Sequence, residues 1–333
     1  MKNNLPNIVI LATGGTIAGI AGSATTTVGY SPAAISVEAL IEMVPEIETI
    51  ANISGQQIVQ ISSQDMNNDI WLALGKKVNE LLSDPDVAGV VITHGTDTME
   101  ETAYYLHLVV KSEKPVVLVG AMRPSTAMSA DGPNNLYNAV ALAGSKNAWR
   151  KGVLIVMNDT IHSAREVTKA STFLTDAFQA PGLGALGYIQ SDVAHFYKEP
   201  TGRHTINSRF CTARIDELPK VDIAYGYANV TRVAIDAFVS DGSQGIIYAG
   251  TGNGSLTDEV MNALIEARNN DVLVVRSTRV GSGLVARNGE VNDDELDFVV
   301  SNTLNPQKAR VLLLLALTQT NDTKEIQQMF YEY

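Results

Sequence analysis

Short apolar runs rich in valine and isoleucine recur along this chain, and each is followed by glycine or polar residues and then by a helical pattern. The first runs span residues 8–12, 90–93, 116–119 and 153–157. Because these runs lack alternating polar residues, the strands that they predict are covered on both faces. Such an alternation of strand and helix is typical of a mainly parallel sheet flanked by helices. The sequence therefore predicts an α/β fold.

Apolar residues at helical spacing lie between these runs, at 70–81 and again at 103–110. Thr98 and Glu101 match the Thr-x-x-Glu capping box, in which each side chain accepts a hydrogen bond from a free backbone N–H at the start of a helix. A helix is therefore expected to begin there. Asp97 would then lie on the loop immediately before that helix.

Polar residues replace the apolar pattern between about 196 and 220. Beyond this stretch, strand patterns return at 221–225, 245–249 and 272–275, with helical patterns near 231–240 and 256–268. The 333 residues of the chain also exceed the roughly 250 to 300 at which a single core stops growing. We therefore predict a larger N-terminal α/β domain over residues 1–198 that carries the candidate catalytic threonines, a linker over 199–220, and a smaller C-terminal α/β domain over 221–333.

Charge and composition exclude several classes of partner. The formal net charge of −12 comes from 36 acidic and 24 basic residues, so the chain repels phosphate backbones and anionic membranes. The apolar run at 311–317 is far shorter than the roughly 18 residues that span a bilayer. Cys211 is the only cysteine, which excludes an intramolecular disulfide and thiolate-rich zinc sites. We therefore expect a small-molecule ligand, no nucleic acid and no membrane partner.

Ligands of open α/β sheets bind beyond the carboxyl ends of the strands, so the residues directly after each apolar run are candidates for a site. Four such loops contain reactive or small side chains: Thr13-Gly14-Gly15-Thr16, His94-Gly95-Thr96-Asp97, Gly120-Ala121-Met122-Arg123, and Asn158-Asp159 with Thr168-Lys169 further on. Together they supply hydroxyls, carboxylate and an ammonium group.

The glycine-rich stretch ATGGTIAG, residues 12–19, does not fit a phosphate-binding loop. A Walker-type loop needs a lysine where this chain has Ile20, and the dinucleotide fingerprint needs a glycine where this chain has Thr16. Two other interpretations remain open. The glycines let a substrate approach the backbone and expose Thr16 as a nucleophile, or Thr13 and Thr16 only hydrogen-bond the turn.

A threonine hydroxyl is a weak nucleophile unless a base lies within about 3 Å of it. Tyr30, Asp97 and Lys169 are the candidates that could tune such a base. By default, however, Asp97 is a carboxylate at a helix N-terminus and Lys169 a solvated surface lysine. His94 and Asp97 suggest a metal, but no third ligand stands at a recognisable spacing and there is no HExxH motif. No metal and no cofactor are therefore expected.

Two motifs in combination change these interpretations. ATGGTIAG at 12–19 and THGTDTMEE at 93–101 closely resemble the two signature motifs of the bacterial-type L-asparaginase family. SSQDM, VGAMRPSTAMSADGPNNLYNAV and LNPQKARVLLLLALT are similar to the same family, so the resemblance covers nearly the whole chain. Within the family, the chain is most similar to the type II enzymes, which are exported and tetrameric.

The resemblance implies a role for individual residues. Thr16 would be the primary nucleophile and Tyr30, on the loop at 19–31, its partner hydroxyl. Lys169 would keep Thr96 polarised in a second cluster that includes Asp97. The implied catalytic residues are Thr16, Tyr30, Thr96, Asp97, Lys169 and Glu290, and the implied substrate-binding residues are Ser63, Gln64, Thr96, Asp97, Ala121, Asn253 and Glu290.

Within that binding set, Ser63 and Gln64, with Asp97, would hold the α-carboxylate and α-ammonium groups, and Ala121 would lend backbone near the scissile amide. Asn253 and Glu290 would reach the active site of an adjacent subunit, so the resemblance implies a homotetramer whose sites are shared. Type II enzymes are periplasmic, and this compartment is the one implied; no leader segment precedes the first strand of this chain, which leaves the cytoplasm as the alternative.

The expected activity is that of an L-asparagine amidohydrolase, which releases L-aspartate and ammonia through a threonine acyl-enzyme. A broader glutaminase-asparaginase is the alternative within the same class, because one methylene changes binding by only about 1 to 3 kcal/mol. A non-catalytic amino-acid-binding protein is the alternative from a different class. Such a protein would have no use for a lysine beside Thr96.

Overall fold

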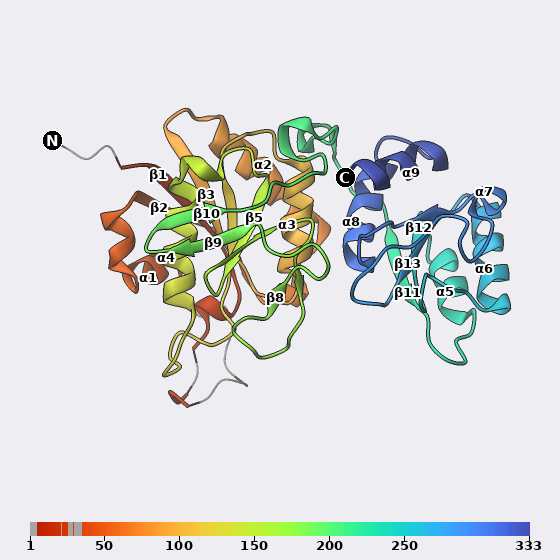
Figure 1. Ribbon diagram of the computed structural model, residues 1–333, viewed down its shortest axis with the longest axis horizontal. Coiled ribbons are helices and arrows are strands. Elements are labelled where there is room, and N and C mark those ends of the chain that lie inside the picture. The colour runs from red at the N-terminus through yellow and green to blue at the C-terminus, as the bar shows by residue number, and fades with distance from the viewer. Residues whose placement is uncertain (1–4, 21, 26–28, 30–34) are drawn as a thin grey trace. The chain divides into compact units, whose positions relative to one another are not determined.

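The structure is a computed structural model that describes residues 5–20, 22–25, 29 and 35–333. The chain divides into two compact units, Met1–Arg214 and Ile215–Tyr333 (Figure 1). The boundary lies inside the segment 199–220 that the sequence predicts as a linker, and the part of this segment up to residue 214 belongs to the first unit. Each unit is a mainly parallel sheet with helices, so the predicted α/β fold class is confirmed.

The first unit contains an eight-stranded sheet in the order β10-β9-β6-β5-β4-β3-β1-β2. Its strands are β1 (Asn7–Gly14), β2 (Asn52–Ile61), β3 (Val87–Thr93), β4 (Val116–Val119), β5 (Val153–Met157), β6 (Thr160–Ser163), β9 (Gly187–Gln190) and β10 (Val193–Phe196). The strands β1 to β5 are parallel, and Ile10 of β1 lies opposite Gly55 of β2 and Val91 of β3. The other three strands extend the sheet in antiparallel fashion.

Helices cover both faces of this sheet (Figure 1). They are α1 (Val37–Glu42), α2 (Asn68–Ser83), α3 (Met99–Val109) and α4 (Gly132–Gly144), with short 3-10 segments at η1 (Thr16–Ala18), η2 (Pro45–Thr49), η3 (Ser63–Asp65), η4 (Lys146–Ala148), η5 (Thr205–Asn207) and η6 (Thr212–Arg214). Ile8 and Ile10 of β1 share one buried cluster with Leu136 and Val140 of α4. On the other face, α2 packs on β3 and α3 on β5.

A two-stranded ribbon of β7 (Thr168–Lys169) and β8 (Phe178–Gln179) lies apart from the main sheet and places Lys169. The order 2-1-3-4-5 of the parallel strands sets β1 between β2 and β3. From β1 the chain therefore continues to β2 on one side and later to β3 on the other. The carboxyl end of β1 is thus the topological switch point, where ligands of open α/β sheets bind.

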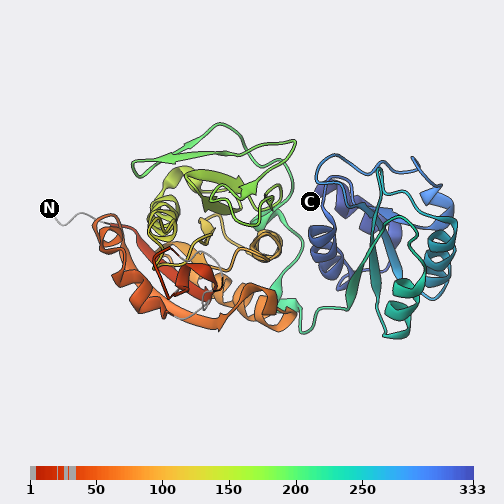
Figure 2. The ribbon, with the colours of Figure 1, turned by 90° about the horizontal axis from the view of Figure 1, so that it is seen from below.

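The second unit contains a four-stranded parallel sheet in the order β11-β12-β13-β14. Its elements are β11 (Val221–Tyr225), α5 (Val233–Ser240), β12 (Gly245–Gly250), α6 (Asp258–Asn269), β13 (Leu273–Thr278), α7 (Asp293–Leu296), β14 (Val299–Val300), α8 (Pro306–Leu317) and α9 (Thr323–Glu332). Ile246 and Tyr248 of β12 join a buried cluster with α5 and α6, whereas Gly245 lies against Leu313 of α8. Alternate residues of β12 therefore face opposite layers of helices. Figure 2 shows these helices on the two sides of the sheet.

The apolar run at 311–317 lies in α8, where most of its side chains are buried. In the part of the chain that the structure describes, no helix has both the length and the apolar character that crossing a membrane requires.

Candidate active site

Two glycines bring the loops after β1 and β3 into contact. Gly15 has a φ of 84°, and a Cβ atom there would lie 2.4 Å from the Cα atom of Gly95. The N–H of Gly15 also donates to the carbonyl of Ile61 at the end of β2 (3.1 Å). Only a residue without a Cβ atom allows this approach. The backbone contact therefore sets Thr16 beside the ends of β2 and β3, at the switch point of the sheet.

A cavity of about 460 Å³ opens at this point, a volume in the range of small-molecule sites. Its lining consists of Gly15, Thr16, Gly29, Ser62, Ser63, Gln64, Gly95, Thr96, Asp97, Met122, Arg123, Lys169, Thr172 and Phe173. Six of the side chains predicted from the sequence therefore surround one cavity. Ala121 is fully buried, and its neighbours Met122 and Arg123 line the cavity instead. Tyr30 lies outside the described residues.

The side chain of Lys169 is directed at two of these residues. Its Nζ atom donates to Thr96 Oγ1 at 2.8 Å and to Asp97 Oδ1 at 2.6 Å. The side chain of Lys169 is 16% exposed, so it is not a freely solvated surface lysine. Because the oxygen of Thr96 accepts from the ammonium group, the hydroxyl proton of Thr96 remains available to donate to another group.

A buried carboxylate holds the backbone that carries this lysine. Glu100, in the first turn of α3, is 4% exposed and accepts from the hydroxyl of Thr168 at 2.9 Å and more weakly from the N–H of Lys169 at 3.4 Å. The sequence analysis did not identify Glu100, although it lies inside the THGTDTMEE motif. A carboxylate followed by a second one, Glu101, is ordinarily a pair of solvated side chains, so the sequence gave no sign that Glu100 would be buried.

Ser63 connects the loop after β2 to the loop after β3. Its Oγ atom accepts from the N–H of Asp97 (3.3 Å), and its carbonyl accepts from the hydroxyl of Thr98 (2.8 Å). The capping box predicted for α3 is therefore wrong, because Thr98 makes no side-chain bond to the helix start. Its hydroxyl bonds to the neighbouring loop instead. Gln64, next to the buried Ser63, is exposed at the cavity.

His94 is fully buried behind this loop, and burial lowers the pKa of its imidazole to about 4. The indole N–H of Trp71 donates to Thr102 Oγ1 (2.9 Å), and Thr102 Oγ1 lies 2.9 Å from His94 Nε2. His94 Nδ1 lies 2.7 Å from the carbonyl of Gly95, which can only accept. The proton of the neutral ring is therefore on Nδ1, and Thr102 donates to Nε2.

Both ring nitrogens of His94 are thus engaged, so the metal site considered for His94 and Asp97 has no free imidazole. Within the described ranges, no group of three or more His, Cys, Asp or Glu side chains could hold a metal ion. The neutral histidine instead fixes the backbone of the loop that carries Thr96.

The hydroxyl of Thr13 does not bond its own turn but donates to the carbonyl of Thr93 at the end of β3 (2.9 Å), in the interior. Thr16, at 8% exposure, lines the cavity. A second residue that the sequence analysis missed is Asp131, directly before α4. Its carboxylate accepts from the N–H groups of Met122 and Arg123, each at 2.9 Å, and so holds the third loop of the site.

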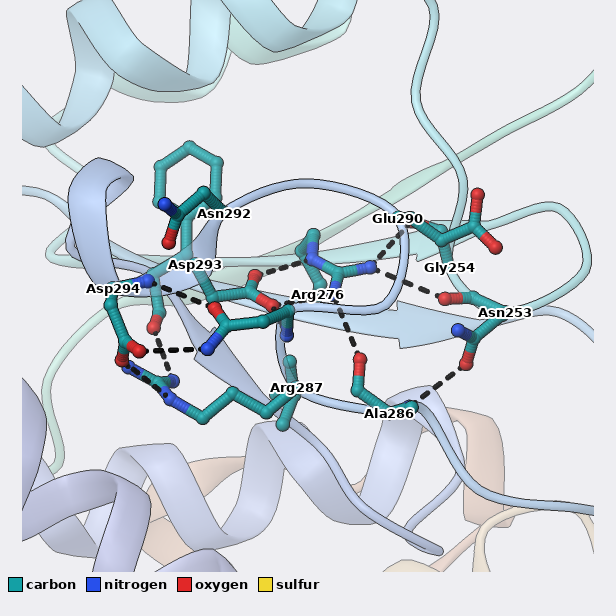
Figure 3. Close-up of polar contacts among 12 residues, drawn as sticks. Asn253, Gly254, Arg276, Ala286, Arg287, Glu290, Asn292, Asp293 and Asp294 are labelled. Carbon is teal, nitrogen blue, oxygen red and sulfur yellow. Dashed lines mark hydrogen bonds and ion pairs between the residues drawn. The ribbon is translucent and has the colours of Figure 1, made fainter.

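The predicted residues of the second unit lie on two loops (Figure 3). The N–H of Ala286 donates to Asn253 Oδ1 (2.8 Å), and the hydroxyl of Ser255 donates to Glu290 Oε2 (3.0 Å). The carboxylate of Glu290 is exposed. The second unit therefore presents an amide and a carboxylate on connected loops.

Comparisons with known proteins identify both units. Residues 7–202 match the family model described as asparaginase, N-terminal, and residues 220–330 match the glutaminase/asparaginase C-terminal domain. L-asparaginase 2 of Bacillus subtilis is 54% identical over all of this chain and 88% of its own length, and the glutaminase-asparaginase of Pseudomonas fluorescens is 52% identical over all of this chain and 92% of its own. The crystal structure of a probable cytoplasmic L-asparaginase from Campylobacter jejuni superposes with a TM-score of 0.96, at 50% identity, over 98% of this chain and all of that one.

Proposed function

The chain belongs to the asparaginase family, and on that premise we propose that the cavity of the first unit is its catalytic site, with Thr16 as the nucleophile. The protein is an amidohydrolase that converts L-asparagine to L-aspartate and ammonia, and not a non-catalytic amino-acid-binding protein. One observation carries the assignment of the site: the Nζ atom of Lys169 lies 2.8 Å from Thr96 Oγ1 in the cavity that Thr16 lines.

In the proposed reaction, the hydroxyl oxygen of Thr16 attacks the carbonyl carbon of the side-chain amide. We assign the stabilisation of the negative charge that develops on the carbonyl oxygen to backbone N–H groups of the loops that line the cavity. Ammonia then leaves, and water hydrolyses the acyl-enzyme to release aspartate. We assign Thr96, polarised by Lys169, to proton transfer in these steps, and Tyr30 to the partner hydroxyl of Thr16.

The substrate is a small zwitterion, which needs donors for its α-carboxylate and acceptors for its α-ammonium group. We assign the donors to Ser63 and Gln64 and the acceptors to Asp97 and Glu290. The backbone at Ala121 is assigned to the region of the scissile amide. Acidic groups around a site that binds an ammonium group agree with the acidic balance of the chain.

Asn253 and Glu290 are proposed to act in the site of an adjacent subunit of a homotetramer. A monomer would then lack part of its substrate-binding set. Light scattering combined with activity measurements on dilution tests this proposal, because activity should be lost as the assembly dissociates. A monomer with full activity would contradict it.

We propose asparagine rather than glutamine as the preferred amide, with a broader glutaminase-asparaginase as the alternative that the relative from Pseudomonas fluorescens illustrates. Comparing kcat/KM for the two amides decides between them. For the compartment we propose the periplasm, since a relative from Haemophilus influenzae that is 52% identical is named a probable periplasmic L-asparaginase. Fractionation of the native cell tests this against the cytoplasm, which the name of the Campylobacter protein suggests for that protein.

The nucleophile is tested by trapping the intermediate. Acid quenching during turnover, followed by peptide mass analysis, should find an aspartyl ester on the peptide that contains Thr16. The same ester on the peptide that contains Thr96 would show that the second threonine is the nucleophile. Denatured protein mixed with asparagine is the control for non-enzymatic labelling.

A further inference from the structure

A buried ion pair lies between the two loops that carry Asn253 and Glu290 (Figure 3). Arg276 of β13 and Asp293 at the start of α7 are both 0% exposed, and two parallel contacts of 2.6 and 2.7 Å join the guanidinium to the carboxylate. This bidentate geometry fixes both side chains in orientation as well as in distance. The two side chains therefore have fixed positions inside the second unit.

The remaining donors of Arg276 reach the backbone of both loops. Nη1 donates to the carbonyls of Asn253 (3.2 Å) and Gly254 (3.1 Å), and Nη2 donates to the carbonyl of Ala286 (3.2 Å). The carboxylate of Asp293 also accepts from the N–H of Asn288 at 2.7 Å. One guanidinium and its partner therefore hold the first loop by its carbonyls and the second loop from two sides.

The sequence of the first loop is adapted to this contact. Gly254 has a φ of +77°, and a Cβ atom there would lie 3.1 Å from the Nη1 atom of Arg276 and 2.9 Å from the carbonyl oxygen of Ser277. A side chain at this position would be strained in its backbone and would also push the loop away from the guanidinium. Glycine is what allows the carbonyls to approach Arg276.

The same contacts fix which groups the loops present. The N–H of Ala286 can only donate, so the atom of Asn253 that it meets is the amide oxygen. The amide nitrogen of Asn253 is then left to act as a donor. Glu290 accepts from Ser255 and remains exposed, so the two loops together present one donor and one carboxylate at a fixed separation.

We propose that Arg276 and Asp293 form a positioning pair for the hydrolysis, which sets the amide of Asn253 and the carboxylate of Glu290 at the separation that the substrate zwitterion needs. This inference rests on the proposed function, in which these two groups complete the site of an adjacent subunit. Stability alone does not account for the pair, because well-packed apolar residues in place of a buried ion pair are often as stable or more so.

Two variants test the pair. Arg276→Lys keeps the charge but loses the bidentate fork and the contacts to the three carbonyls. The double variant Arg276→Met with Asp293→Leu removes both charges, so that neither is left buried alone. In each, kcat/KM for asparagine should fall roughly 10- to 100-fold, mainly through a higher KM, with the tetramer intact by light scattering.

Arg268→Lys is the matched control, since the guanidinium of Arg268 in α6 pairs with Asp297 of the same unit at 2.7 Å rather than with the loops of Asn253 and Glu290. This variant should keep the KM of the parent. Equal changes of KM in the control and in Arg276→Lys would overturn the proposal, because they would indicate a general loosening of the unit.

Mixed assemblies separate positioning from folding. Subunits with Arg276→Lys are reassembled with subunits that carry Thr16→Ala; each mixed pair then contains one site with an intact threonine and an intact second-unit contribution. Activity with the parent KM should reappear. Persistent loss of activity in these mixtures, or parental kinetics of Arg276→Lys by itself, would overturn the proposal.

A second mixture tests the premise on its own. Thr16→Ala subunits combined with Glu290→Gln subunits should also regain activity if the sites are shared. If activity returns in this mixture but not in the Arg276→Lys mixture, the positioning pair is rejected and the shared site is retained. No recovery in the Glu290→Gln mixture rejects the shared site, and with it the inference.

Discussion

The two units hold their site loops by different means. In the first unit, the backbone at Gly15 touches Gly95, and separate side chains each hydrogen-bond to one loop: His94, Ser63, Glu100 and Asp131. In the second unit, a buried guanidinium and its carboxylate hold the loops. The loops of Thr16 and Thr96 directly follow neighbouring strands, so the sheet largely determines where their side chains lie. Glu290 lies twelve positions beyond the end of β13 at Thr278, too far for the sheet to place it, and a charged cross-link does so instead.

The units also differ in the groups that they offer. The first presents the hydroxyls and the ammonium group that suit proton transfer and nucleophilic attack, together with the carboxylate of Asp97. The second presents an amide and a carboxylate, which suit recognition of a zwitterion. We therefore expect the chemical step to depend on the first unit and substrate affinity to depend on both.

The largest expected effect tests this division. Thr16→Ala should lower kcat by roughly 10⁴-fold or more while substrate binding remains, because the covalent step loses its nucleophile. Glu290→Gln should act mainly on KM. Steady-state assays of ammonia release, with calorimetric titration of asparagine into the inactive variant, measure both. Thr13→Ala is the control, since the hydroxyl of Thr13 bonds to the end of β3 and Thr13 is not part of the cavity lining; undiminished kcat in Thr16→Ala would remove Thr16 from its role.

A smaller loss is expected at the second cluster. Lys169→Met removes the donor to Thr96 and should lower kcat by about 10²- to 10³-fold, in the range of a lost proton-transfer partner. Lys151→Met is the control, because Lys151 pairs with Glu199, outside the cavity of the site. Kinetics and circular dichroism together distinguish lost chemistry from lost structure. A folded Lys169→Met enzyme with the kcat of the parent would show that polarisation of Thr96 is dispensable.

Acid should affect the two units differently, because all five histidines of the chain lie in the first. Burial lowers the pKa of His94 to about 4 and also lowers the pKa of His204. The unfolded chain therefore binds protons at a higher pH than the folded one. The free energy of unfolding of the first unit is therefore full above about pH 6.5, the pKa of a histidine in the unfolded chain. It decreases as the pH falls toward 4, by roughly 3 kcal/mol from His94 alone.

Hydrogen exchange of each unit between pH 7 and pH 4.5 measures this difference. Amides of the first unit should lose protection, whereas those of the second should change little, since the lowered pKa values of its paired carboxylates Asp236 and Glu266 move their titration to lower pH. His195→Gln is the control, because His195 is exposed. Equal acid sensitivity of the two units would contradict the assignment to buried histidines.

The smallest effect concerns the glycine contact. Gly15→Ala adds a Cβ atom against the backbone of Gly95, whereas Gly182→Ala, at a φ of +90°, adds one to open space. Both carry the strain of a positive φ, so the difference between them isolates the steric contact. We expect Gly15→Ala to lower the free energy of unfolding by about 2 kcal/mol more than Gly182→Ala in urea titrations. Equal decreases in the free energy of unfolding for the two variants would mean that the contact between the loops of Gly15 and Gly95 does not contribute to stability.

The sequence predicts those parts of the fold whose pattern is local. The runs at 8–12, 90–93, 116–119 and 153–157 become buried parallel strands, because a strand covered on both faces is apolar throughout. The strand β2 gives no such signal, since its residues are partly buried or exposed along its whole length at the edge of the sheet. The two-residue strand β7 is too short for any period.

The candidate site divides in the same way. The loops with Thr16 and Thr96 follow predicted strands, so their proximity can be expected from the topology, and the resemblance supplies their roles. Arg276 and Asp293 are seventeen positions apart and are charged, which in a sequence indicates surface residues. Their burial depends on contacts between loops, and no local pattern records such contacts. The wrong capping box at Thr98 has the same cause.

The bonds from Trp71 through Thr102 to His94 run in a single direction and end at the carbonyl of Gly95. In a trans peptide the carbonyl and the next N–H point in opposite senses, so the N–H of Thr96 is turned away from the buried ring. The indole on α2 thus supports, through Thr102 and His94, the orientation of one peptide at the cavity. Replacing Trp71 would therefore remove the first donor of a chain that supports the peptide between Gly95 and Thr96, and both of these residues line the cavity.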